Sequence, residues 1–116
     1  MATHRVSRGR KSQEFAATYL QSIFPDAESL AASLPGKDIK NTPGWAFEVK
    51  GRRDFVPTQW SKQMTKNRLP DEYSACIMRP DGYGEVKVGE WLVFMTFKEF
   101  RDLIEEVESL RRELED

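Results

Sequence analysis

The chain has 116 residues, of which 39% are hydrophobic and 32% are charged, and its formal net charge is −1. This is enough apolar material for one small domain, and no run approaches the ~18 apolar residues of a membrane-spanning helix. Cys76 is the only cysteine, which excludes an intrachain disulfide and a cysteine-based zinc site. His4 is the only histidine and lies in an N-terminal end that is expected to fray, which rules out a Ser-His-Asp or Cys-His triad. Any catalysis therefore has to use carboxylates and lysine, with or without a hard cation.

The charge is unevenly distributed along the chain. Residues 1–68 contain 12 Lys and Arg against 6 Asp and Glu, whereas residues 69–116 contain 6 against 13. A basic first half is consistent with an anionic partner for one face, and equally with an ordinary solvated surface.

The N-terminal segment, residues 1–11, is polar and basic and is predicted to be a flexible arm, followed by a single domain over residues 12–116. The arm lacks the apolar core of a secretory signal, so we expect a cytoplasmic location and no membrane partner. Apolar residues then recur at helical spacing, which predicts a first helix from Ser12 to Phe24 that Pro25 ends.

Short extended pieces and one strand are predicted next. A short strand can form within residues 27–33, residues 38–40 are extended, and residues 41–44 have turn composition. Residues 45–50 alternate in polarity and predict a strand. This alternation assigns Trp45, Phe47 and Val49 to one face of the strand, and Ala46, Glu48 and Lys50 to the other.

A second helix is predicted after a loop at residues 51–55. Pro57 suits a first helical turn, and a polar run follows as far as Leu69. One face of this helix is marked by Trp60, Met64 and Asn67.

The last third of the chain is predicted to hold three strands and a helix. A buried strand at residues 73–78 is followed by a hairpin-like turn at 80–84 and by strands at 85–88 and 91–95. The whole order predicts a single α/β domain with a mixed central sheet flanked by helices.

A capping box opens the last helix. Thr96 and Glu99 have the required spacing. Behind them an apolar stripe recurs at helical spacing: Phe97, Phe100, Leu103, Ile104, Val107 and Leu110.

Two carboxylates and a lysine form the most informative group. Asp38 begins an extended piece, and Glu48 and Lys50 share one face of the next strand, so the two carboxylates can converge at one end of a hairpin. Such a pair suits Mg²⁺, with the Val49 carbonyl as a further oxygen ligand and Lys50 beside a water or phosphate. An exposed cross-strand pair of Glu48 and Lys50 is the plainer alternative.

In this order, the residues resemble the PD-(D/E)XK nuclease superfamily, and more narrowly the small Holliday junction resolvases encoded by phages of actinobacteria. The similarity covers the chain from about Ser12 to Val107. It depends on five features: Glu14, Asp38, the Glu48-Val49-Lys50 strand, the Trp60-Ser61-Lys62-Gln63 stretch and the Glu90–Thr96 strand.

The resemblance implies a restriction-endonuclease-like core and a structure-selective DNA endonuclease that works with Mg²⁺, for which Mn²⁺ is expected to substitute. Asp38, Glu48 and Val49 would then be metal ligands, Lys50 the catalytic lysine and Glu14 an outer or second-metal ligand. Gln63 would contact water or phosphate. A four-way junction is two-fold symmetric, so the resemblance also implies a homodimer that acts in phage DNA recombination or processing.

Basic residues around this group would line a phosphate track. Lys37 stands where the superfamily name has Pro, and Ser33 is a candidate for the loop serine of archaeal resolvases. The full expected DNA-binding set is Arg8, Arg10, Lys11, Ser33, Lys37, Lys40, Arg52, Arg53, Lys62 and Lys66.

Two alternatives stay open. The chain could be another nicking, repair or restriction-type endonuclease with the same core. It could also be a DNA-binding module without activity, although the intact Asp38, Glu48 and Lys50 argue against loss of a site.

Overall fold

A mixed three-stranded sheet lies at the centre of the computed structural model, which describes residues 2–30, 37–54 and 56–115. Strand β3 (Trp45–Gly51) runs parallel to β4 (Tyr73–Arg79), and β4 runs antiparallel to β5 (Leu92–Phe94). The expectation of a single α/β domain with a mixed sheet flanked by helices is confirmed.

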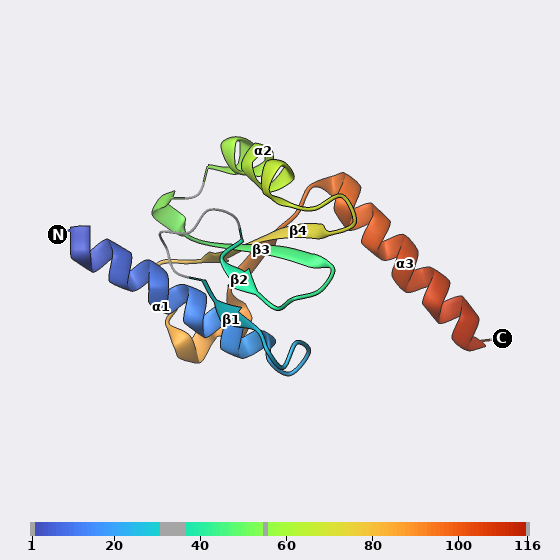
Figure 1. Cartoon of the computed structure of the whole chain (residues 1–116), viewed down its shortest axis with the longest axis horizontal. Helices are drawn as coiled ribbons and strands as arrows, with labels where there is room; N and C mark the ends of the chain where they lie inside the picture. The colour runs from blue at the N-terminus through green and yellow to red at the C-terminus, as the bar shows by residue number, and fades with distance from the viewer. Residues whose placement is uncertain (1, 31–36, 55, 116) are drawn as a thin grey trace.

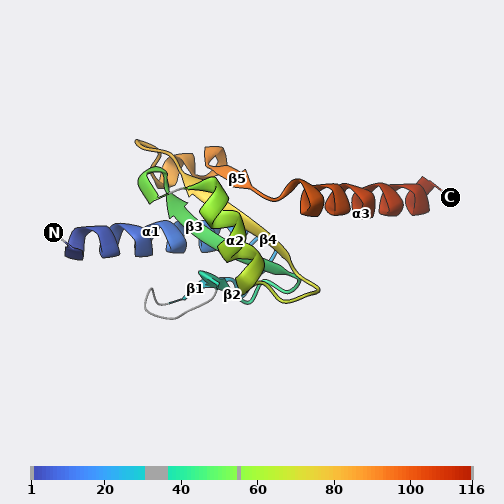
Figure 2. The ribbon, with the colours of Figure 1, turned by 90° about the horizontal axis from the view of Figure 1, so that it is seen from above.

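The two faces of the sheet are covered by different helices, α1 (Ala2–Leu20) and α2 (Pro57–Asn67) (Figures 1 and 2). Alternation along β3 and β4 sends one set of apolar side chains to each helix, as predicted for β3. The core beneath α1 contains Ala16, Ala17, Phe47, Val49, Ala75 and Ile77. The smaller cluster beneath α2 consists of Trp60, Met64 and Cys76.

A two-stranded antiparallel sheet, β1 (Glu28–Ser29) and β2 (Ile39–Lys40), flanks the free edge of β3. The backbone N–H of Asp38 donates to the carbonyl of Phe47 at 3.0 Å. The short strand predicted within residues 27–33 is confirmed at Glu28–Ser29, while residues 31–33 lie outside the described residues. The extended piece predicted at residues 38–40 is also confirmed, and it brings Asp38 alongside β3.

The first helix differs from its prediction at both ends. Residues 2–11, expected to be a flexible arm, form its first turns. Five of these ten residues are Ala, Arg or Lys, which favour a helix, whereas Gly9 costs about 1 kcal/mol. The helix ends at Leu20 and not at Phe24. Pro25 disfavours a helical conformation at the residue before it, and a tight turn closes instead through Phe24 N–H donating to the Leu20 carbonyl at 2.8 Å.

The strand predicted at residues 85–88 is wrong. The segment is a kinked 3₁₀ helix, η2 (Glu85–Glu90), and a second one, η1 (Arg52–Asp54), lies in the expected loop after β3. The alternation at 85–88 has no apolar face to bury, because Val88 packs on the core whereas Val86 is fully exposed. Strand β5 pairs with β4 directly instead.

The last helix, α3 (Phe97–Glu115), begins where the capping box predicted. The Glu99 N–H donates to Thr96 Oγ1 at 3.2 Å. The Glu99 carboxylate, however, is buried against β4: it accepts hydrogen bonds from Ser74 N–H at 2.7 Å and from Ser74 Oγ at 2.9 and 3.0 Å. Beyond this anchor α3 leaves the body of the domain (Figures 1 and 2).

Glu99→Ala is expected to lower the free energy of unfolding by about 2–4 kcal/mol, because it leaves the buried N–H and hydroxyl of Ser74 without their acceptor. Urea unfolding measures this. The control is Glu105→Ala, which removes only the exposed ion pair with Arg101 and should cost less than about 1 kcal/mol. Equal losses in the two variants would contradict an anchoring role for Glu99.

Candidate active site

Asp38 is fixed to the edge of β3 by two hydrogen bonds. Its backbone N–H donates to the Phe47 carbonyl, and its Oδ2 accepts from the Val49 N–H at 2.7 Å. Since the N–H and C=O of one strand residue lie on the same side, the Val49 carbonyl also faces this edge. A carboxylate and a backbone carbonyl are therefore brought together where β3 has no partner strand.

Glu48 brings a second carboxylate to the same place from the face of β3 that α2 covers. Its side chain is buried, and Asn67 Nδ2 donates to its Oε1 at 3.3 Å. Burial raises the pKa of Glu48 to about 7, reinforced by the negative charge of Asp38 and by a hydrogen bond with that carboxyl group. Asn67 and Lys50 act in the opposite direction.

Lys50 completes the group two positions along the strand. Its ammonium lies over the Trp60 ring of α2, 5.6 Å from the ring centroid. This contact holds the ammonium on the side of the sheet where Glu48 lies. The structure thus brings Asp38, Glu48, Val49 and Lys50 together, in the arrangement the sequence predicted, while their chemical roles stay predictions.

The donor set fits a hard divalent cation. Among the described residues, His, Cys, Asp and Glu form no group of three or more that could hold a metal. Two carboxylates and the Val49 carbonyl nonetheless suffice for Mg²⁺, which keeps several of its waters. A bound cation would offset both the burial of Glu48, which is the main cause of its raised pKa, and the repulsion from Asp38.

Glu14 and Gln63 are not brought into this group. Glu14 is an exposed residue of α1 whose carboxylate pairs with Arg10 at 3.5 Å. Gln63 is exposed on α2, on a different side from Trp60 and Met64, and makes no hydrogen bond to the carboxylates. For either residue to act at the site, its side chain would have to move toward Asp38 and Glu48, or bound substrate would have to extend from the carboxylates to it.

An arginine-lined cavity of about 520 Å³ adjoins Lys50 at the carboxyl ends of β3 and β4. Its basic lining residues are Lys50, Arg52, Arg53 and Arg79. Arg52 faces Asp81 at 3.9 Å across an exposed pair, and Arg53 is exposed. The carboxyl ends of parallel strands are a common place for anionic ligands to bind, and these guanidinium groups suit phosphate.

Arg79 is held by several contacts. Its Nε donates to the Tyr83 carbonyl at 2.7 Å, one terminal nitrogen donates to Ser12 Oγ at 2.9 Å, and its guanidinium lies 5.5 Å from the Trp91 ring centroid. Within the described residues no carboxylate neutralises it, so its positive charge is available to the cavity.

The other expected DNA-binding residues are placed differently. Lys37 pairs with the buried Glu72, and Lys40 pairs with Glu28 at 3.4 Å, so both link segments of the domain. The basic side chains of Lys11, Lys62 and Lys66 are exposed. Arg10 pairs with Glu14, the backbone of Arg8 lies in α1, and Ser33 lies outside the described residues.

Sequence reasoning missed Asn67 and Arg79 as members of the site. Asn67 could have been found, because it lies one helical turn from Met64 on the predicted inner face of α2 and is the polar residue of that face. Arg79 gave no such signal, since its place beside Lys50 depends on the parallel pairing of Gly51 with Arg79.

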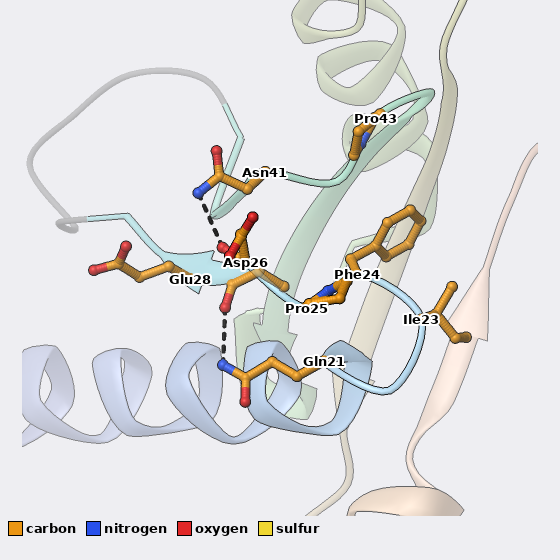
Figure 3. Close-up of a pocket in the computed structure, with 9 residues that line it drawn as sticks. Gln21, Ile23, Phe24, Pro25, Asp26, Glu28, Asn41 and Pro43 are labelled. Carbon is orange, nitrogen blue, oxygen red and sulfur yellow. Dashed lines mark hydrogen bonds between the residues drawn. The ribbon is translucent and has the colours of Figure 1, made fainter.

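A larger cavity, of about 750 Å³, lies between the end of α1 and the β1–β2 pair (Figure 3). Both amide side chains in its lining donate hydrogen bonds to nearby backbone carbonyls: Gln21 Nε2 to Ala27 at 3.0 Å, and Asn41 Nδ2 to Asp26 at 2.9 Å. These two amide nitrogens are therefore already engaged within the protein. The carboxylates and the lysine of the candidate site lie at β3 instead.

Comparisons of this chain with known protein families, with curated proteins and with solved structures find no match. Within the described part of the chain, no helix has both the length and the apolar character needed to cross a membrane.

The stability of the protein without divalent ions is expected to fall as the pH rises from about 5 to 7.5, by about 1–3 kcal/mol relative to Glu48→Gln. The pKa of Glu48 is about 7 in the folded chain against 4.5 as the ordinary value, so the folded state binds the proton more tightly over this window. Urea unfolding at several pH values measures the difference. Parallel pH profiles for the two proteins would contradict the burial of an ionisable carboxyl at this position.

Proposed function

We propose that this protein is a divalent-metal-dependent, structure-selective DNA endonuclease, and that its substrate is a Holliday junction formed in phage DNA recombination or processing. The observation that carries the proposal is the meeting of Asp38 and Glu48 at the free edge of β3, with Lys50 beside them. The resemblance of these residues to the PD-(D/E)XK nucleases supports the same activity.

Each residue of the site has a distinct task in this proposal. Asp38, Glu48 and the Val49 carbonyl hold the cation, and Asn67 orients the Glu48 carboxylate. A bound Mg²⁺ would neutralise charge on the phosphate and make water a better nucleophile. Lys50, steadied over Trp60, orients the attacking water and pairs with a phosphate oxygen.

DNA phosphates are held by the cavity next to Lys50. Arg52, Arg53 and Arg79 present guanidinium groups there, and a site with two carboxylates needs such compensation to approach a polyanion. Lys62 and Lys66 extend the positive surface along α2. Paired nicks in a symmetric junction need two such sites, so we propose a homodimer as the acting species.

Cleavage of a four-way junction, compared with a linear duplex of the same sequence, tests the activity. Cuts in the junction with Mg²⁺, and none with a chelator, are expected. Cleavage of the duplex alone would favour a restriction-type or nicking enzyme. Binding without cleavage of either substrate, with any divalent ion, would favour a module that only binds DNA.

DNA affinity is expected to fall steeply with salt, because counterions are released from each phosphate that is neutralised. Arg53→Ala should weaken binding and reduce the slope of log K against log salt by about one. Fluorescence anisotropy at several salt concentrations measures both quantities, with Arg112→Ala in α3 as the control. A slope that Arg53→Ala leaves unchanged would remove this cavity from the DNA contact.

A further inference from the structure

Helix α3 presents an uncovered apolar stripe. The helix projects from the body of the domain (Figure 2). Phe97, Leu110 and Leu114 are 83%, 58% and 87% exposed, and Phe100, Ile104 and Val107 are also exposed. An apolar surface of this length on one helix is the usual mark of a protein partner.

The stripe follows a heptad repeat. Phe100, Val107 and Leu114 are seven residues apart, and Leu103 and Leu110 lie three residues after the first two. This is the a/d pattern of a coiled coil, and Ile104 widens it at an e position. The fit of every a and d position from 100 to 114 points to another helix as the partner.

The helix is hydrogen-bonded to its own domain by two glutamates. Glu99 binds Ser74, and Glu106 accepts a hydrogen bond from the Tyr73 hydroxyl at 2.8 Å. Both glutamates occupy g positions, beside the a/d seam. In the seam, Phe100 borders a cavity with β5 and Leu110 one with Tyr73, yet the two side chains are still 49% and 58% exposed. The seam is thus accessible to a partner while the helix base is held in place.

Charges beside the seam select the partner and its direction. Glu106 at a g position and Arg111 at the next e position would meet across a parallel pair of identical helices. An antiparallel pair would instead set Glu106 against Glu113, which repel. Residues 97–115 hold 7 Asp and Glu against 4 Lys and Arg, so this surface repels nucleic acid and anionic lipid.

An apolar cavity continues the seam at the base of α3. It is about 460 Å³ in volume and is lined by Val93, Phe94, Met95, Phe97 and Phe100. Strand β5, which contributes to it, is the edge of the sheet. The seam of α3 is little more than two heptads long, which is short for a stable coiled coil. Apolar contact at this cavity would add to the buried surface of such a pair.

We propose that two copies of this chain pair through α3 as a parallel two-stranded coiled coil, with the cavity at the base of α3 adding apolar contact. The two domains then lie at the same end of the helix pair, on either side of the two-fold axis. This pairing does not depend on the nuclease proposal, and its tests use no DNA.

Sedimentation of the full chain over a range of concentrations tests the pairing. The wild-type chain is expected to form a dimer with a Kd in the range of about 1–100 µM. Val107→Asp places a charge in the seam and should weaken pairing at least ~10-fold, whereas Ser109→Asp, with the same charge outside the seam, should not. A monomeric wild-type chain at several hundred µM, or equal effects of both variants, would overturn the proposal.

Oxidative cross-linking tests the direction of the helices. In a parallel pair the two Leu110 positions face each other at a distance that suits a disulfide, so Leu110→Cys should form a covalent dimer. Ser109→Cys is the matched control and should not. A dimer in sedimentation whose Leu110→Cys variant fails to cross-link would overturn the parallel arrangement.

Discussion

Asp38→Asn and Glu48→Gln are each expected to slow cleavage of a four-way junction by at least ~1,000-fold. Loss of one carboxylate removes a ligand from a small donor set, and a catalytic metal supplies several kcal/mol of transition-state stabilisation, at about 1.4 kcal/mol for each factor of ten. DNA binding should persist or strengthen, because each change removes negative charge that faces phosphate. Single-turnover cleavage and anisotropy measure the two effects separately.

Asp38→Asn and Glu48→Gln are expected to preserve the local fold, because an amide has nearly the shape of the carboxylate that it replaces. Asn at position 38 can still accept the hydrogen bond from the Val49 N–H through its side-chain oxygen. Asp71→Asn is the matched control, since Asp71 is exposed on the turn before β4. Wild-type turnover in Asp38→Asn or Glu48→Gln would contradict the assignment of that residue as a metal ligand.

Lys50→Ala and Lys50→Arg are both expected to lose at least ~100-fold in rate, at the low end of what a positioned acid–base group contributes. Arginine keeps the charge but is planar, bulkier and effectively always protonated. It cannot place a compact ammonium over Trp60 and beside the carboxylates. Metal binding should survive in both variants, because Asp38 and Glu48 are unchanged.

Single-turnover cleavage and divalent-ion titration of the two variants check this prediction. Lys98→Ala and Lys98→Arg on the exposed surface of α3 are the controls, and their rates should stay within a few-fold of the wild type. Near-normal cleavage by Lys50→Arg would leave Lys50 with only an electrostatic role on the sheet surface.

The parts of the fold that could be predicted from the sequence are those with strong local patterns. Alternation places Glu48 and Lys50 on one face of β3, and the capping box at Thr96 places the start of α3. The wrong prediction of a strand at residues 85–88 came from a short alternation of polar and apolar residues. A strand also needs a partner strand and an apolar face to bury, and these depend on the whole fold.

Some residues of the candidate site could likewise be grouped from the sequence, and others could not. Asp38, Glu48 and Lys50 are close together along a hairpin-like path and could be grouped from spacing alone. Asn67 and Arg79 join them only through the packing of α2 and the register of β4, which no short stretch of sequence specifies.

Alternation along β3 also limits how a site of this kind can change during evolution. Phe47 and Val49 fill the core beneath α1, and Glu48 lies between them on the opposite face. A one-residue insertion or deletion within the strand would exchange the two faces, burying the carboxylate in the core and exposing the apolar side chains to α2. Mutational drift can therefore move the acidic position only in steps of two residues, and changes of chain length are tolerated only outside the strand.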